Sequence, residues 1–181
     1  MNDHAGAVLL PIARAAIGSR FGLAAATDET ADWLAETGAT FVTLRRADEL
    51  RGCIGTLEPY RPLLEDVKSN AVAAAFSDRR FAPLSMNEWP DTLVEVSLLS
   101  ALEPIEFADE ADALARLRPY VDGIVLGLRG KRSTFLPQVW ESLPEPREFL
   151  AQLKRKAGLA ADFWSGEVKL WRYSVDKCAE Q

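Results

Sequence analysis

Residues 50–76 read LRGCIGTLEPYRPLLEDVKSNAVAAAF, and this stretch decides the fold because it joins a strand to the clearest helix of the chain. Its first part, residues 50–57, predicts a strand, although Gly52 and Gly55 lie within it. Its last part, residues 62–76, predicts a helix with one apolar stripe. That stripe consists of Leu63, Leu64, Val67, Ala71, Ala74 and Ala75. We expect the strand and the helix to pack face to face.

Upstream of this stretch, the sequence predicts two helices. Residues 8–21 carry apolar residues at helical spacing, and Pro11 suits the first turn of that helix. Residues 28–36 predict a shorter helix, with Thr27 as its N-cap and Gly38 as its stop.

The remaining elements do not alternate regularly between strand and helix. Strands are predicted over residues 39–46, 92–99 and 168–175, helices over 110–117 and 147–157, and a hairpin over 123–136, followed by a polar tail. This order favours an α+β fold with a mixed, largely antiparallel sheet flanked by helices. The length suits one domain over residues 1–181. The only candidate subdomain break lies near residues 27–38 and would leave the N-terminal helices as a small lobe.

Composition excludes several classes of function. The chain has 21 basic and 27 acidic residues and a net charge of −6, which argues against binding a nucleic-acid backbone. No apolar run approaches the roughly 20 residues of a membrane span, and the N-terminus lacks the pattern of a signal peptide. Two cysteines, Cys53 and Cys178, do not suggest a disulfide framework. We therefore expect a soluble, cytoplasmic protein.

The sequence contains a single histidine, His4. A Ser-His-Asp or Cys-His catalytic arrangement is thus almost excluded, and so is a zinc site built from histidines. Glycine-rich nucleotide-binding motifs do not occur. We expect no metal and no cofactor.

Sequence blocks spread over residues 41–173 resemble the AMMECR family, also called AmmeMemoRadiSam system protein A. The blocks are residues 50–56 (LRGCIGT), 70–71 (NA), 74–76 (AAF), 78–81 (DRRF), 83–84 (PL), 94–100 (VEVSLLS), 135–140 (FLPQVW), 156–159 (KAGL) and 171–173 (WRY). One departure is Arg79, which stands where the family commonly has proline. The resemblance implies an α+β fold of two subdomains and no established catalytic activity. It also implies two partners, a Memo-class protein and a radical S-adenosylmethionine enzyme.

The candidate site is centred on Cys53, which lies between Gly52 and Gly55. In one interpretation Cys53 is a nucleophile that the positive charge of Arg51 activates. In the other, which we favour, it is a small buried residue, because no histidine can serve as its base. The two glycines and Ile54 either line a ligand or partner surface or allow another chain segment to approach closely.

Three polar residues complete the candidate site. Asn70 falls on the apolar stripe of its helix, where a buried amide needs hydrogen-bond partners. Asp78 follows the end of that helix and needs a charged partner, which Arg80 or Arg51 could supply. We expect all these residues to converge on one concave site.

Two further segments are basic. Arg129, Lys131 and Arg132 occupy the predicted hairpin turn, and residues 154–156 (KRK) occupy the last turn of a helix. Solvent exposure and the helix dipole account for these charges, with anion binding as the minor alternative.

The function hypotheses are therefore an accessory or interaction module that works with the two family partners, and an enzyme that uses Cys53 and Arg51 on a small anionic or carbonyl substrate.

Overall fold

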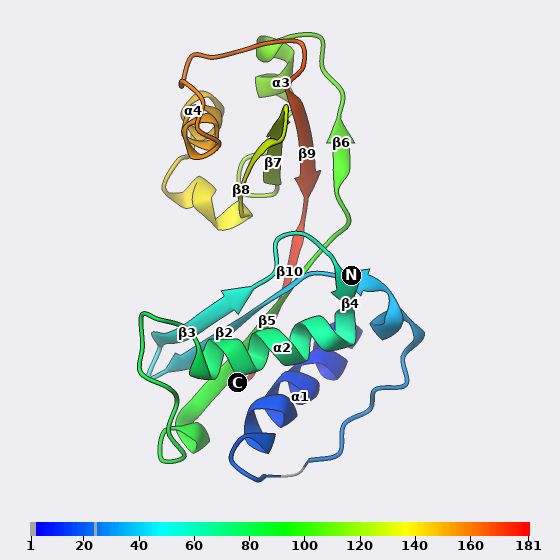
Figure 1. The fold of residues 1–181 in the computed structure, drawn as a ribbon, viewed down its shortest axis with the longest axis vertical. Coiled ribbons are helices and arrows are strands. Elements are labelled where there is room, and N and C mark those ends of the chain that lie inside the picture. The colour runs from blue at the N-terminus through cyan, green and yellow to red at the C-terminus, as the bar shows by residue number, and fades with distance from the viewer. Residues whose placement is uncertain (1–2, 24) are drawn as a thin grey trace. The chain divides into compact units, whose positions relative to one another are not determined.

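The structure is a computed structural model that describes residues 3–23 and 25–181. Its internal contacts divide the chain into two compact units (Figure 1). The first unit combines Met1–Leu99 with Asp176–Gln181, and the second is Ser100–Val175. The candidate break near residues 27–38 lies inside the first unit, so it does not mark the division between the two.

The first unit is built on a four-stranded sheet in the order β10-β5-β2-β3. The strands are β2 (Thr40–Arg46), β3 (Glu49–Gly55), β5 (Thr92–Leu99) and β10 (Val175–Ala179). Strand β2 pairs antiparallel with both β3 and β5. A separate antiparallel pair joins β1 (Thr37–Gly38) to β4 (Arg61–Pro62). The α+β fold with antiparallel pairing is thereby confirmed.

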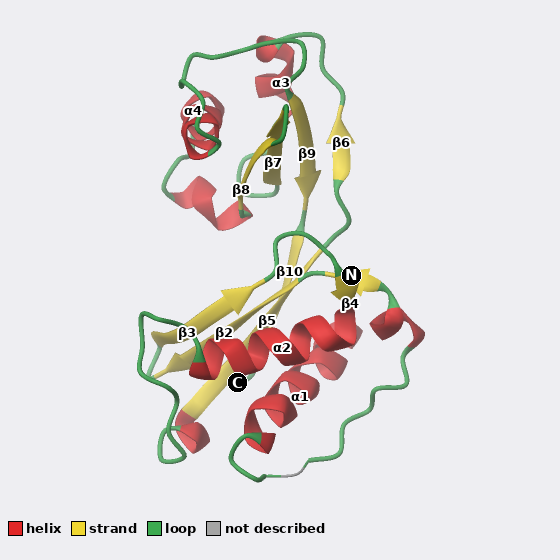
Figure 2. Ribbon diagram, viewed as in Figure 1, coloured by secondary structure: helices red, strands yellow, loops and turns green. Residues whose placement is uncertain are grey.

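Two helices, α1 (Asp3–Ser19) and α2 (Leu63–Phe76), pack against this sheet (Figure 2). Alternate strand residues, such as Val42 and Val96, meet Val67 of α2 in one core. Buried residues of α1 belong to the same core. The N-terminal helix is therefore part of the first unit's core rather than a lobe of its own.

Two N-terminal predictions need correction. Helix α1 begins earlier than expected, so Pro11 lies inside it and not in its first turn. The expected helix over residues 28–36 is only a 3-10 turn, η1 (Asp32–Ala35). In the first turn of the expected helix, the Asp28 carboxylate accepts hydrogen bonds from the Thr30 N–H and hydroxyl. Such local side-chain hydrogen bonds compete with those of a helix.

The β2–β3 hairpin is closed by Ala47 and Asp48, whose φ angles of 49° and 63° lie in the left-handed region. Because Arg46 pairs with Glu49, this is a two-residue turn of the type that fits the twist of a hairpin. The register shifts between Leu44 and Arg45, which leaves Arg51 as the extra residue of a β-bulge.

The second unit has its own sheet in the order β6-β9-β7-β8, with a second core. Its elements are β6 (Glu103–Ile105), α3 (Glu110–Arg116), β7 (Gly123–Leu128), β8 (Lys131–Phe135), η3 (Pro137–Glu141), α4 (Pro146–Lys156) and β9 (Lys169–Tyr173). Gly158 ends α4 with a φ of 74°, as the sequence predicts.

The C-terminal prediction is wrong in one respect. The strand expected over residues 168–175 ends at Tyr173, and the supposed polar tail forms β10, which joins the sheet of the first unit beside β5. Within the part of the chain that the structure describes, no helix has the length and apolar character needed to cross a membrane.

Candidate functional site

Asn70 and Cys53, which the sequence analysis places in one site, belong to two separate groups of polar residues. Asn70 lies in the middle of α2 and faces the beginning of β2. Cys53 lies in β3 and is bonded to Asp78 and Arg80, which follow the end of α2. The structure therefore brings Cys53, Asp78 and Arg80 together and leaves Asn70 apart from them.

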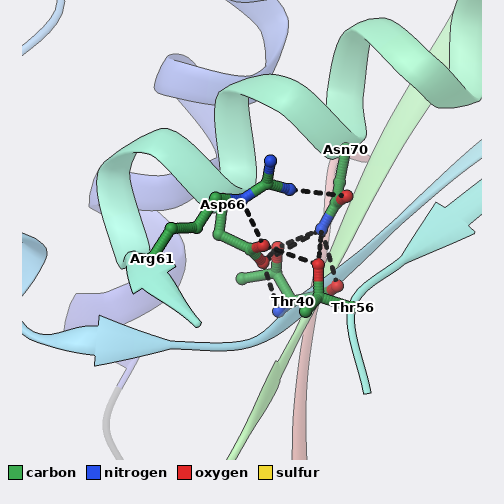
Figure 3. Close-up of polar contacts among 5 residues, drawn as sticks. All are labelled: Thr40, Thr56, Arg61, Asp66 and Asn70. Carbon is green, nitrogen blue, oxygen red and sulfur yellow. Dashed lines mark hydrogen bonds and ion pairs between the residues drawn. The ribbon is translucent and has the colours of Figure 1, made fainter. Parts of the chain in front are cut away.

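The first group is centred on Asp66, a carboxylate without solvent exposure, and we call it the Asp66 cluster (Figure 3). Its members are Thr40, Thr56, Arg61, Asp66 and Asn70. Asp66 accepts hydrogen bonds from the Thr40 N–H at 2.8 Å and from the Thr40 hydroxyl at 2.7 Å. It also accepts from the Thr56 hydroxyl at 2.6 Å and from Arg61 Nε at 2.9 Å. A buried carboxylate requires such donors, and these bonds fasten α2 to β2.

Asn70 completes the Asp66 cluster. Its amide Nδ2 donates to Asp66 at 2.9 Å and to the Thr40 carbonyl at 2.9 Å, and its Oδ1 accepts from Arg61 Nη2 at 3.3 Å. The donors and the acceptor of this amide are thus engaged within the chain. Asn70 therefore ties the helix to a neighbouring strand, and the hydrogen-bond partners that its buried amide requires come from the chain itself.

The second group covers the outer edge of β3, and we call it the Cys53 cluster; its members are Arg51, Cys53, Asp78, Arg80 and Glu88. Asp78 Oδ2 accepts the Cys53 N–H at 2.9 Å, and Arg80 Nη2 donates to the Cys53 carbonyl at 3.3 Å. Asp78 and Arg80 are also paired with each other at 2.7 Å. Because β3 is an edge strand, this pair satisfies backbone groups that a further strand would otherwise bind.

Asp78 owes its charge state to this arrangement. The hydrogen bonds from the Arg80 guanidinium hold the pKa of Asp78 far below its ordinary value, and the Cys53 N–H adds to the effect. The same pairing raises the pKa of Arg80. The Asp78–Arg80 pair is therefore a fixed ion pair that shapes the loop, and Arg80 is the charged partner of Asp78 that the sequence left open between Arg80 and Arg51.

Arg51 is engaged by a residue that the sequence analysis did not single out. Its Nε and Nη2 donate to the two oxygens of Glu88 at 2.9 and 3.2 Å, and Nη2 also reaches the Ala82 carbonyl at 3.0 Å. Only 14% of its side chain is exposed. The Arg51 guanidinium, followed by the N–H and hydroxyl of Ser85, lowers the pKa of Glu88 to about 2.

One nitrogen of Arg51, Nη1, is buried and has no hydrogen-bond partner among the described residues. Arg51 also lines an open hollow of about 600 Å³ at the β2–β3 turn, together with Arg46, Glu49, Leu50 and Asp91. The two basic and two acidic side chains of this hollow balance each other, so it has no electrostatic preference for an anion.

The thiol of Cys53 is half-buried and lies on the face of the sheet that points away from α2. This follows because Gly52, its neighbour in the strand, faces the helix. The Thr43 hydroxyl lies opposite and donates to the Cys53 sulfur at 3.3 Å. Since Glu88 already neutralises Arg51, that arginine does not act as the free positive charge that the nucleophile interpretation requires.

The glycines of β3 do not leave open space. A Cβ on Gly52 would lie 2.2 Å from the Ala74 carbonyl oxygen, and a Cβ on Gly55 would lie 2.2 Å from the ring of Phe41. Of the two alternatives for these glycines, the structure matches the close approach of another chain segment and not a ligand surface, because the backbone of α2 and an aromatic ring occupy that room. Ile54 packs against the core of the first unit.

Asp66 and Glu88 are the important residues that the sequence analysis missed. Asp66 could have been found, because it precedes Asn70 by one helical turn and so shares its face. Glu88 carries no such signal, since it stands 37 positions from Arg51 in an irregular segment. Among the described residues, no group of three or more histidine, cysteine or carboxylate side chains could hold a metal ion.

Comparison with known proteins gives consistent results. A protein of Methanothermobacter thermautotrophicus is 36% identical over 154 residues, which cover 82% of this chain and 78% of that protein. A protein of Sulfolobus acidocaldarius is 38% identical over an alignment of 187 residues, which covers 96% of this chain and 81% of that protein. The crystal structure of the uncharacterized protein PH0010 from Pyrococcus horikoshii matches with a TM-score of 0.81 and 31% identity, covering all of this chain and 94% of that one.

The model of the AMMECR1 family matches residues 10–178, nearly the whole chain. The resemblance read from the sequence blocks is thereby confirmed, and this chain belongs to the AMMECR1 family.

Proposed function

We propose that this AMMECR1-family chain is an interaction module that works with a Memo-class protein and a radical S-adenosylmethionine enzyme. The choice of partners rests on the family resemblance. The choice of a module over a catalyst rests on how the polar residues are used. Asp66, Asn70, Asp78 and Arg51 all bond to groups of their own chain, and this use favours a rigid framework over an open reactive centre.

The observation that carries the proposal is the loop between β3 and β4. This loop exposes 68% of Tyr60 and 37% of Leu57. The guanidinium of Arg61 lies 4.9 Å from the centre of the Tyr60 ring and donates hydrogen bonds to Asp66 and Asn70, which hold it in place. Tyrosine and arginine are the residue types that dominate binding energy in protein interfaces. Their fixed geometry lowers the ordering cost of binding.

The test is co-expression of the affinity-tagged chain with the Memo-class and radical S-adenosylmethionine proteins of the same organism. We expect at least one of them to co-purify. Tyr60→Ala should weaken that association about tenfold or more, while Tm stays unchanged. Tyr120→Ala is the matched control, because Tyr120 is 62% exposed but belongs to the second unit. Failure to recover either partner, even after crosslinking, would overturn the proposal.

An enzyme acting through Cys53 is the second candidate, and two contacts favour it. The Thr43 hydroxyl bonds to the half-buried sulfur, and Arg80 reaches the carbonyl of the same residue. Rapid, stoichiometric alkylation of Cys53 by iodoacetamide at neutral pH would support this enzyme. Slow labelling, at the rate of an ordinary thiol, would support the module.

A further inference from the structure

The two basic segments of the second unit lie side by side and are bonded to each other. Lys131, at the start of β8, donates from Nζ to the Gly158 carbonyl at 3.1 Å, just beyond the end of α4. Lys156, in the last turn of α4, donates from Nζ to the Thr134 carbonyl of β8 at 3.0 Å. These reciprocal bonds hold the β7–β8 turn against the end of α4.

A third element extends this basic region across the second sheet. In the register of the strands, Gly127 of β7 lies between Arg132 of β8 and Lys169 of β9. The Trp171 ring covers Gly127, and the Arg132 guanidinium lies 5.5 Å from the centre of that ring. Two cations therefore flank one aromatic ring on the face of the sheet opposite the core.

We call this region the basic end of the second unit. It consists of six exposed side chains: Arg129, Lys131, Arg132, Arg155, Lys156 and Lys169. Lys154 is excluded, because it is buried and paired with Glu110. The second unit as a whole has eleven basic and eleven acidic residues, so the basic end is a local concentration of charge.

Most of this charge is not neutralised inside the chain. Arg129 is paired with Glu167, but Lys131 and Lys156 bond to uncharged carbonyls. Within the described ranges, neither the Arg155 guanidinium nor the Lys169 ammonium group takes part in a hydrogen bond or an ion pair. Four exposed cations are thus available to carboxylates from outside.

We propose that the basic end binds a short acidic segment of a partner protein. A stretch of glutamates or aspartates could meet the cations of the β7–β8 turn, α4 and β9 individually, with charge-assisted hydrogen bonds. A long nucleic-acid backbone is a poorer fit, because the whole chain has 27 acidic and 21 basic residues, and its net charge of −6 disfavours the approach of a long polyanion. This inference rests on the proposed role as an interaction module and adds a second contact surface, independent of Tyr60.

The test is fluorescence anisotropy of a labelled peptide of about ten glutamates, titrated with the full chain at about 50 mM salt, where surface charges are weakly screened. The charge-reversal variant Arg155→Glu with Lys169→Glu leaves the two bonded lysines in place. We expect it to weaken binding about tenfold or more. The matched control reverses two exposed cations of the first unit, Arg20→Glu with Arg79→Glu, and should stay within about twofold of the wild type.

Several results would overturn this inference. One is equal binding by both double variants, and another is no wild-type binding below about millimolar concentration. Tighter binding of a short DNA duplex than of the peptide would assign the basic end to nucleic acid. Dimerisation that Arg155→Glu with Lys169→Glu abolishes would assign it to the acidic unit of a second copy. The variant Tyr60→Ala should bind the peptide normally, so this inference and the proposed function can fail separately.

Discussion

Replacing Gly52 by alanine tests how tightly β3 is packed against α2. The added Cβ would lie 2.2 Å from the Ala74 carbonyl oxygen, whereas ordinary contact begins at 3.4 Å, so the two elements must separate by about 1.2 Å, the difference between these values. The obstacle is helix backbone, which cannot change rotamer. The Asp66 cluster also fastens α2 to the sheet and resists the movement.

We therefore expect Gly52→Ala to lower the free energy of unfolding by about 3 kcal/mol, the upper end of the usual range for an overpacked site. In a chain of this length such a loss lowers Tm by roughly 10 °C. Urea unfolding followed by circular dichroism gives the free energy, and a thermal melt gives Tm. The variant should keep the slope of the urea transition, because the folded state remains compact.

Two controls accompany this variant. Gly166→Ala places its Cβ in open space and should leave Tm within about 2 °C of the wild type. In the variant Gly55→Ala the added Cβ meets the Phe41 side chain. The double variant Gly55→Ala with Phe41→Leu should therefore regain part of the Tm that Gly55→Ala alone loses. A Tm of Gly52→Ala equal to that of Gly166→Ala would refute the reasoning, since α2 would then not touch β3 as described.

Three further predictions concern the polar clusters. Glu88 has a folded pKa of about 2 against an ordinary 4.5, so its stabilisation is complete above pH 4.5 and is lost as pH falls toward 2. Between pH 5 and pH 3, the Tm of the variant Glu88→Gln should consequently fall less than the Tm of the wild type. An equal fall in Tm would contradict this. Asn70→Ala should cost about 3 kcal/mol in urea unfolding, because it leaves buried partners of the Asp66 cluster unsatisfied; a cost under about 1 kcal/mol would argue against it. Cys53→Ala should cost only about 1 kcal/mol in the same assay, and a much larger cost would mean that the thiol is more deeply packed.

Elements with a strong local signal are predictable from the sequence. The apolar stripe of α2 and the apolar run of β5 place those elements within a residue of their observed bounds. Gly158 is equally clear, because a helix commonly ends at a glycine in the left-handed region. In these cases the residues that determine the structure are close together in the chain.

Strand β10 shows what local patterns cannot reveal. Its polar sequence resembles a tail, and its place beside β5 depends on distant groups. The Glu180 N–H donates to the Val94 carbonyl, and the Glu180 carboxylate accepts from the Val94 N–H and from Arg14. The helix expected at residues 28–36 failed for the opposite reason, because short-range bonds of Asp28 outweigh a weak helical pattern.

The candidate site was predicted in part. The pairing of Asp78 with Arg80 follows from their proximity in the chain and from the helix end before them. The partner of Arg51 could not be foreseen, because Glu88 is brought to it only by the fold of the segment that follows α2. Asn70 was correctly placed on the apolar stripe, but its direction toward β2 depends on the rotation of α2 against the sheet.

Strand β10 also affects the order in which the chain can fold during synthesis. Residues 176–181 belong to the first unit, yet they leave the ribosome after the whole of the second unit. Until they emerge, β5 has an unpaired edge, and the first unit cannot complete its sheet. The second unit is contiguous and can fold first, with its two ends joined where the Ser100 N–H donates to the Ser174 carbonyl. A nascent chain that stalls after β9 would therefore present β5 to other polypeptides as a site for aggregation.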